Sequence, residues 1–341
     1  MSENRAAVLH APGDLRVADR PRPEPASQEV LVEIAAVGVC GSDVHYYEHG
    51  RIGSHVVEAP MVLGHEPSGI VTQVGSGVTR HRVGDRVTLE PGVPDLVCDQ
   101  CRAGRYNLCP NVRFFATPPI DGAFARFVTI HEAFAYALPE ELTLEQGALM
   151  EPLSVGVWAC RKGGVGPGSR VLVSGAGPIG NLAAQVALAA GATEVVVTDI
   201  SAHRLDVAAR VGATRVLDVS SSPLAESGTE VDVLLECSGH PAALVDGIRA
   251  LAPAGTAVVV GMGPEEDATV PLSLIQNREL WLTGTFRYAN TYPTAIALAA
   301  QGRVDLEIIM TGRYGLDEAE AALRAPREDP LAIKPMVFPG G

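Results

Sequence analysis

The sequence lacks three features that mark other classes of protein. No apolar run approaches the roughly 18 residues that cross a bilayer, and the first residues, Met1–Arg5, lack the apolar segment of a secretory signal. No basic run is present, and the formal net charge is −14. The sequence therefore offers no cluster of basic side chains that would neutralise the phosphates of a nucleic acid. We therefore expect no membrane span, no nucleic-acid partner and a small neutral substrate.

Cysteine is also scarce, with six residues in a chain of 341. Without a secretory signal we expect a cytoplasmic protein, in which thiols stay reduced. The cysteines are then expected to bind metal or pack in the core rather than to form disulfides. The length predicts two domains, or one domain with a large insertion. The share of hydrophobic residues, 47%, is ordinary for a chain with a substantial core.

The first 150 residues or so have the composition of a mostly β domain. Strand composition is found at 30–34 and 69–74, and residues 83–87 resemble a turn that leads into a further strand. Three prolines between residues 21 and 25 exclude a helix near the start.

After about residue 155 the pattern changes to apolar strands that alternate with helices. The expected strands are 170–173, 194–199, 216–217, 231–235, 257–260 and 280–283. Continuous apolar strands alternating with helices indicate a parallel sheet covered on both faces, and six of them make a complete dinucleotide-binding fold. From Tyr292 the pattern is again helical, and a short strand-like tail is expected to rejoin the first domain.

The loop Gly175-Ala176-Gly177-Pro178-Ile179-Gly180 has the glycine spacing that binds a dinucleotide. The first glycine makes the tight turn, the second lets the pyrophosphate approach the backbone, and the third lets helix pack on strand. The loop follows an expected strand and opens an expected helix, whose free N–H groups would face the phosphates.

Asp199 ends the next strand, about twenty residues further on, and its charge bears on the choice of cofactor. A carboxylate at this place hydrogen-bonds the ribose of NAD and repels the 2′-phosphate of NADP. Asp199 as a helix N-cap is the structural alternative. Arg204 either stacks on the adenine or lies on a solvated helix face.

Two glycine-flanked segments carry candidate zinc ligands. Cys40 lies in Gly38–His45, and His65 and Glu66 follow some twenty residues later. A thiolate, an imidazole and a carboxylate are the ligands that a catalytic zinc ion takes. A single cysteine and histidine are a weak signal alone, because most free cysteines are small buried hydrophobes.

A second group lies in a glycine- and proline-rich loop with the spacing D-x2-C-x2-C-x7-C. It consists of Asp95, Cys98, Cys101 and Cys109. Three cysteines leave a tetrahedral structural zinc one ligand short, and Asp95 can supply the fourth, although a carboxylate holds zinc less well than a thiolate. The alternative is a lobe in which three thiols merely pack.

Four segments together carry a resemblance to a known family. They are Cys40–Gly53, Pro60–Glu66, Met150–Gly156 and Thr285–Thr291. On these segments the chain resembles the zinc-dependent medium-chain alcohol dehydrogenases, and among them the sorbitol or xylitol (polyol) dehydrogenases. The resemblance implies an α/β chain with a GroES-like, mostly β catalytic domain at 1–155 and 287–341. A six-stranded, doubly wound Rossmann domain that binds NAD would occupy 156–286.

The resemblance also implies residue roles at the metal. Cys40 and His65 would bind the catalytic zinc, and Glu66 would complete the site directly or through water. Glu151 stands where simple alcohol dehydrogenases carry a cysteine ligand, a change typical of the polyol branch. Ser42 and His45 would carry the released proton outward. Which of Glu66 and Glu151 is the direct ligand stays open.

The resemblance also implies which residues bind the substrate and the cofactor. Tyr46, Glu151, Arg287 and Tyr288 would contact the polyol, although the tyrosines could instead be core residues and Arg287 could form a salt bridge. Val260, Gly261, Met262, Thr285 and Phe286 would line the NAD site. A homotetramer or homodimer is implied. The alternatives are a butanediol or threonine dehydrogenase, and a zinc-free, NADPH-binding protein of the quinone-reductase or crystallin type.

Overall fold

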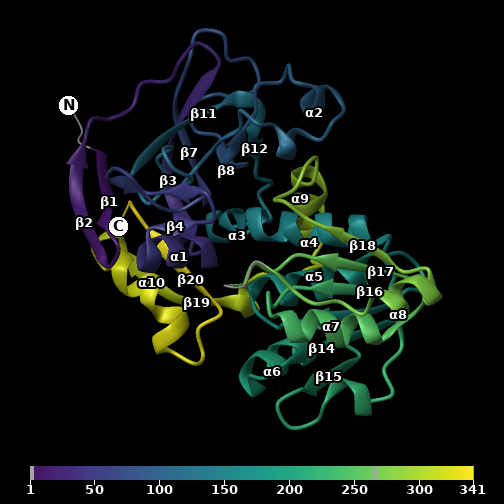
Figure 1. Cartoon of the computed structure of the whole chain (residues 1–341). Coiled ribbons are helices and arrows are strands. Elements are labelled where there is room, and N and C mark those ends of the chain that lie inside the picture. Colours follow the sequence, from purple (N-terminus) through teal and green to yellow (C-terminus); the bar gives the residue numbers. More distant parts are fainter. Residues whose placement is uncertain (1–3, 264–266, 341) are drawn as a thin grey trace. The chain divides into compact units, whose positions relative to one another are not determined.

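The computed structural model describes residues 4–263 and 267–340 (Figure 1). Met1–Glu3, part of the segment in which no secretory signal is found, lie outside the described residues. The chain divides into two compact units, Met1–Glu151 with Met310–Gly341, and Pro152–Ile309. None of the described helices is long and apolar enough to cross a membrane.

The second boundary of the units differs from the expected one. The chain returns to the first unit at Met310, whereas the sequence analysis placed the return at residue 287. Hydrogen bonds between two pairs of residues tie the intervening segment to the second unit. The Gln185 amide donates to the Asp305 carbonyl at 3.0 Å and accepts from its N–H at 2.6 Å, and the Arg161 guanidinium donates to the Asn290 carbonyl at 2.7 Å.

The first unit is built on a sheet that has seven strands among the described residues. These strands are β3 (Glu29–Gly38), β7 (Glu66–Val74), β8 (Arg86–Leu89), β11 (Phe127–His131), β12 (Ala135–Ala137), β19 (Met310–Gly315) and β20 (Lys334–Phe338). β3 is central, because it pairs with β7 along one side and with both β11 and β20 along the other. The expected strand-like tail is thus β20, which joins the sheet of the first unit.

Shorter elements complete this unit. The strands are β1 (Asn4–Ala11), β2 (Asp14–Arg20), β4 (Arg51–Ile52), β5 (His55–Val56), β6 (Met61–Val62), β9 (Gly92–Val93) and β10 (Arg113–Phe114). The helices are α1 (Gly41–His49), α2 (Asp99–Arg102), α3 (Leu144–Ala148), α10 (Ala319–Glu328) and the 3-10 turns η1 (Tyr106–Leu108), η2 (Glu132–Phe134) and η5 (Leu316–Glu318).

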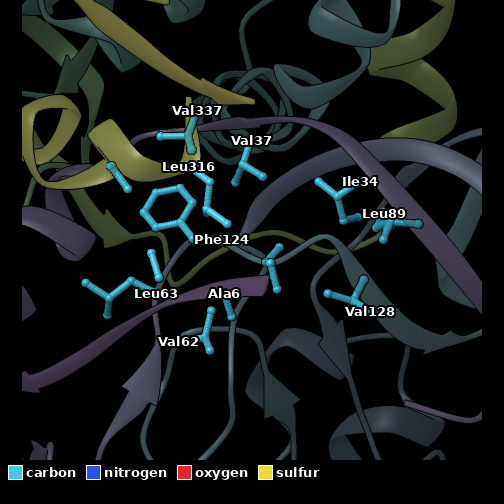
Figure 2. Close-up of a cluster of buried hydrophobic side chains, with 14 of the residues drawn as sticks. Ala6, Ile34, Val37, Val62, Leu63, Leu89, Phe124, Val128, Leu316 and Val337 are labelled. Atoms are coloured by element: carbon cyan, nitrogen blue, oxygen red, sulfur yellow. The ribbon is translucent and has the colours of Figure 1, made fainter. Parts of the chain in front are cut away.

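A buried apolar cluster holds the first unit together. Figure 2 shows the Phe124 ring within this cluster, with Leu316 and Val337 above it and Leu63 below. Burial of each such side chain stabilises the fold by about 1.5–3 kcal/mol relative to its exposure. This core supports the segments that carry the candidate metal ligands, since Leu63 precedes His65 and β3 precedes Cys40.

The second unit contains a parallel sheet with the order β15-β14-β13-β16-β17-β18 within the described ranges. Its strands are β13 (Arg170–Ser174), β14 (Glu194–Asp199), β15 (Arg215–Asp218), β16 (Val231–Glu236), β17 (Leu251–Val259) and β18 (Trp281–Gly284). Its helices are α4 (Met150–Gly163), α5 (Pro178–Ala189), α6 (Ala202–Arg210), α7 (Pro241–Arg249), α8 (Leu272–Arg278), α9 (Tyr292–Ala300) and the 3-10 turns η3 (Leu224–Glu226) and η4 (Glu307–Ile309). All six expected strands are present, although β17 begins at Leu251, earlier than the strand expected at 257–260.

Candidate metal and cofactor sites

Cys40 is positioned at the junction of a strand and a helix. β3 ends at Gly38, and Cys40 is the N-cap residue of α1, with an extended backbone. The Asp43 carboxylate reaches back and accepts a hydrogen bond from the Cys40 N–H at 3.1 Å. The cap therefore fixes the backbone from which the Cys40 thiol projects.

His65 is held by the same Asp43 carboxylate. Asp43 is fully buried, accepts from the Gly64 N–H at 2.9 Å, and lies 3.5 Å from Nδ1 of His65. Burial alone would lower the pKa of His65, but the Asp43 charge and the Cys40 thiol raise it well above its usual value. A carboxylate on one ring nitrogen orients the other nitrogen of a metal-binding histidine. The sequence analysis did not assign this role to Asp43.

Cys40, His65 and Glu66 converge. Each offers one ligand atom, and these atoms lie within 4.8 Å of one another. The thiol, the imidazole and the carboxylate form the donor set of a catalytic zinc site, so the residues fit this metal. The three predicted ligands are brought together as expected, while their role as zinc ligands stays a proposal.

Glu66 has a partner that sequence reasoning missed. Nζ of Lys334 donates to both carboxylate oxygens, at 2.7 and 2.8 Å, and to the Val39 carbonyl at 3.0 Å. Burial lowers the pKa of Lys334, but the Glu66 and Cys40 charges raise it more, so the net shift is upward. Lys334 is therefore a buried ammonium at the candidate metal site.

Glu151 is buried in the first turn of α4 but is not one of the three converging residues. Its carboxylate also contributes to the raised pKa of Lys334. Ser42 and His45 both lie on α1 and are partly exposed. Burial, the neighbouring His49 and Arg327 lower the pKa of His45. A neutral imidazole on this helix can accept a proton.

The expected structural lobe also forms a cluster. One atom from each of Asp95, Cys98, Cys101 and Cys109 lies within 4.8 Å of the others, and the Sγ atoms of Cys98 and Cys101 are 3.4 Å apart. Burial raises the pKa of Cys101 to about 12, and the two neighbouring thiols add to the shift. Three thiols and a carboxylate so close together fit a tetrahedral zinc ion.

Asp95 has further partners within the lobe. Its carboxylate accepts from the Cys98 N–H at 3.0 Å, from the Asn111 amide at 2.7 Å and from the Val97 N–H at 2.9 Å. These bonds hold its pKa below the usual range. Each carboxylate oxygen has two lone pairs, so these bonds leave capacity for a metal.

The glycine loop follows the geometry that its sequence predicts. Gly175 has φ +92, and Gly180 has no room for a side chain, because a Cβ there would lie 1.8 Å from the Gly175 carbonyl oxygen. Gly177, by contrast, has φ −66, and apart from its chain neighbours and the backbone of its own helix, a Cβ there would meet no atom of the described residues within 4 Å. The open space beside Gly177, with α5 starting at Pro178, fits a bound pyrophosphate; Ile179 lies in the same first turn.

Asp199 lies at the end of β14, as expected, and holds the glycine loop. Its carboxylate accepts from the Ala176 N–H at 2.6 Å and from the Ile200 and Ser201 N–H groups at 2.8 Å each. The N-cap of α6 is Ser201 rather than Asp199. Arg204 is partly buried in the first turn of α6.

The remaining cofactor candidates follow two neighbouring strands. Val260, Gly261 and Met262 come after β17, and Thr285 and Phe286 after β18. The carboxyl ends of parallel strands meet at one edge of a sheet, where ligands of such folds bind.

Of the substrate candidates, the two tyrosines are buried. Tyr46 belongs to the apolar cluster of the first unit, and Tyr288 lies 5.8 Å, ring to ring, from Tyr292 in the second. Arg287 has φ +55, and its guanidinium lies 4.8 Å from the centre of the Phe286 ring. The packing of the tyrosines agrees with the alternative of core residues, whereas Arg287 stands at a partly exposed loop after β18.

Comparison with known proteins extends these observations. The model of the alcohol dehydrogenase GroES-like domain matches residues 26–140, and that of the zinc-binding dehydrogenases matches 178–301. Sorbitol dehydrogenase of Macaca fascicularis is 49% identical, over 98% of this chain and 96% of its own.

Two solved structures are similar to this chain in both sequence and fold. An Escherichia coli oxidoreductase/dehydrogenase of unknown specificity is 33% identical, with a TM-score of 0.95 over 99% of both chains. A Sinorhizobium meliloti protein described as a zinc-binding dehydrogenase, in complex with NADP, is 32% identical, with a TM-score of 0.93 over 99% of this chain and 100% of its own.

The chain belongs to the zinc-dependent medium-chain alcohol dehydrogenases. Within that family it is similar to sorbitol dehydrogenases along nearly its whole length. The resemblance inferred from the sequence and the expected α/β fold, a GroES-like unit plus a Rossmann unit, are therefore confirmed.

Proposed function

We propose that this chain oxidises a secondary hydroxyl of a polyol to a ketone and transfers the hydride to NAD. The observation that carries the proposal is the 49% identity to sorbitol dehydrogenase over nearly the whole chain, together with the convergence of Cys40, His65 and Glu66. A zinc-free reductase would have no use for such a ligand set. When bound, zinc lowers the pKa of a substrate hydroxyl and NAD accepts the hydride.

At the metal site, each residue of the chain has a definite task. Cys40 and His65 hold the metal, and Asp43 fixes the orientation of the His65 ring through Nδ1. A carboxylate, Glu66 or Glu151, completes the site. Ser42 and His45 pass the proton of the substrate hydroxyl along α1 to solvent, a task for which the lowered pKa of His45 keeps the imidazole neutral.

In the second unit, the loop from Gly175 to Gly180 cradles the pyrophosphate, and Asp199 faces the adenosine ribose. Arg287 donates to neighbouring hydroxyls of the substrate, because its planar guanidinium offers paired N–H groups that a diol can accept. Tyr46 and Tyr288 remain candidates for further hydroxyl contacts.

The lobe of Asp95, Cys98, Cys101 and Cys109 holds a second, structural zinc ion. The proposal rests on the approach of the four ligand atoms to within 4.8 Å. The six free thiols also fit a reducing compartment such as the cytosol.

The chain forms a homo-oligomer through the edge of its parallel sheet. β18 pairs with β17 on one side, and within the described residues no strand pairs with its other side. Trp281 on this strand is 71% exposed, and Leu282 beside it is also exposed. An exposed apolar edge strand is a template for pairing with a second strand, and a second copy supplies an identical one.

Metal content and turnover of Cys40→Ser test the metal part of this proposal. The two clusters predict two zinc ions per wild-type chain. The variant should keep its fold and one zinc while NADH formation from a polyol is abolished, because a catalytic zinc site contributes less to folding than a closed structural one. Near-full turnover of the variant would exclude Cys40 as a ligand.

A further inference from the structure

A buried ion pair adjoins the proposed metal site. Lys334 is 2% exposed and Glu66 is fully buried. The ammonium of Lys334 uses its three donors on three oxygens, two from Glu66 and one from the Val39 carbonyl. Isolated buried charges are strongly unfavourable, so each of these two groups requires the other.

The strand pairing brings the two residues together from opposite ends of the chain. Met336 of β20 lies opposite Gly38 of β3, and Gly38 lies opposite Glu66 of β7. Lys334 is two residues before Met336, so both side chains leave the same face of β20. The glycine at 38 leaves room for the carboxylate in this position, because a Cβ there would lie 2.0 Å from Oε2 of Glu66. The sheet therefore leaves a space in which this carboxylate meets Lys334.

The carboxylate is also within 4.8 Å of the ligand atoms of Cys40 and His65. It thus has two competing cationic partners, the ammonium and a metal ion. An ammonium on both oxygens withdraws charge from the carboxylate and makes it a poorer metal ligand.

We propose that Lys334 is a positioning residue that holds the Glu66 carboxylate and weakens its bond to the metal. The inference rests on the zinc site proposed above. By restraining Glu66, Lys334 leaves the metal a coordination position that a substrate hydroxyl can occupy, and it limits the negative charge around the metal. Lys334 therefore lowers the affinity of the site for the metal and makes the bound metal more open to substrate and more acidic.

Two measurements on the folded, metal-loaded protein test this role, neither of which depends on turnover. One is the rate of zinc release to a chelator, and the other is the visible spectrum after cobalt(II) replaces zinc, which reports the ligands of the metal. Zinc content of the wild type tests the metal site itself. A wild type without zinc would refute the proposed site, whereas the variants below test Lys334 in a protein that does bind metal.

In Lys334→Met, the freed carboxylate should bind the metal more strongly. Zinc release from this site should slow about tenfold or more, and the cobalt spectrum should change. In the Glu66→Gln background the same substitution should have little effect, because Lys334 acts through Glu66. Lys334→Arg, which keeps the charge, should stay nearer the wild type. Release from the Asp95 lobe provides an internal reference that should not vary.

Gly38→Ala provides a second route that leaves every charge in place. Its Cβ displaces the Glu66 carboxylate from the position in which Lys334 holds it, so the cobalt spectrum should again change. This variant decides the matter if Lys334→Met does not fold. Equal zinc release in wild type and Lys334→Met, an equal effect of Lys334→Met with and without Glu66, or an unchanged spectrum in Gly38→Ala would overturn the proposal.

Discussion

We propose that the choice between NAD and NADP depends on Asp199. Its carboxylate holds the glycine loop through the Ala176 N–H, and the same charge would face the 2′-phosphate of NADP. One relative of similar fold is bound to NADP, so the fold alone does not decide the cofactor. The fixed negative charge at the end of β14 favours NAD.

We expect Asp199→Ser to narrow the preference for NAD over NADP by about tenfold without a full reversal. Serine removes the repulsion but supplies no cation for the phosphate. The ratio of kcat/KM with the two cofactors checks this. Asp206→Ser, which removes an exposed carboxylate from α6, is the matched control. Comparable kcat/KM for NAD and NADP in the wild type would exclude the role.

We expect Arg287 to distinguish a polyhydroxylated substrate from a simple alcohol. In Arg287→Ala, kcat/KM for a polyol should fall about tenfold or more, since a lost hydrogen bond to a charged donor costs about 1.5–3 kcal/mol. A short simple alcohol offers nothing to the second N–H, so its oxidation should hardly change. An equal loss with both substrates, accompanied by a lower melting temperature, would mean that Arg287 is structural.

At the scale of the element, a buried carboxyl group follows directly after β8. Glu90 accepts hydrogen bonds from Tyr106 at 2.7 Å and from Tyr136 at 2.9 Å. Burial raises its pKa to about 7, from 4.5, although both tyrosines act in the opposite direction. The folded pKa thus lies above the unfolded one. The protonated form stabilises the fold below about pH 4.5, and this contribution is lost as the pH rises through 7.

Between about pH 5 and pH 8, the free energy of unfolding of the wild type should fall by up to about 3 kcal/mol relative to Glu90→Gln. Glutamine stays neutral and can still bond both tyrosines. Urea unfolding of the two proteins at both pH values measures the difference. Glu58→Gln, at an exposed position, is the control. A pH dependence identical in wild type and Glu90→Gln would show that Glu90 does not titrate in this range.

The elements of the second unit could be predicted closely from the sequence. Strand 194–199 coincides with β14, because an apolar run bounded by a glycine turn and an N-capped helix leaves little freedom at either end.

In the metal site, Cys40 and His65 could also be predicted, because each lies in a short glycine-flanked segment that is visible in the sequence. Such a segment is a local signal. Lys334 carries none, since its role arises from the pairing of β20 with β3 and a partner 268 residues away. The position at which the chain re-enters the first unit, Met310, could not be predicted from the sequence either, because it depends on contacts such as that of Gln185 with Asp305.

At the scale of the whole molecule, the edge strand β18 predicts association. Trp281→Lys should shift the protein to a smaller species, because a charge on an edge strand opposes pairing with a second strand. Sedimentation or light scattering measures this. Val83→Lys replaces a residue of the first unit that is 61% exposed and should leave the mass unchanged. An unaltered oligomer in Trp281→Lys would place the interface elsewhere.

The central claim concerns the reaction, and one measurement on the wild-type protein tests it most directly. NADH formation is followed with sorbitol, xylitol and ethanol, before removal of zinc by a chelator, after removal, and after zinc is restored. We predict oxidation of the polyols with a kcat/KM far above that of ethanol, loss of this activity without zinc, and its return with zinc. Equal activity in the zinc-free protein, or ethanol oxidised as well as the polyols, would contradict the assignment.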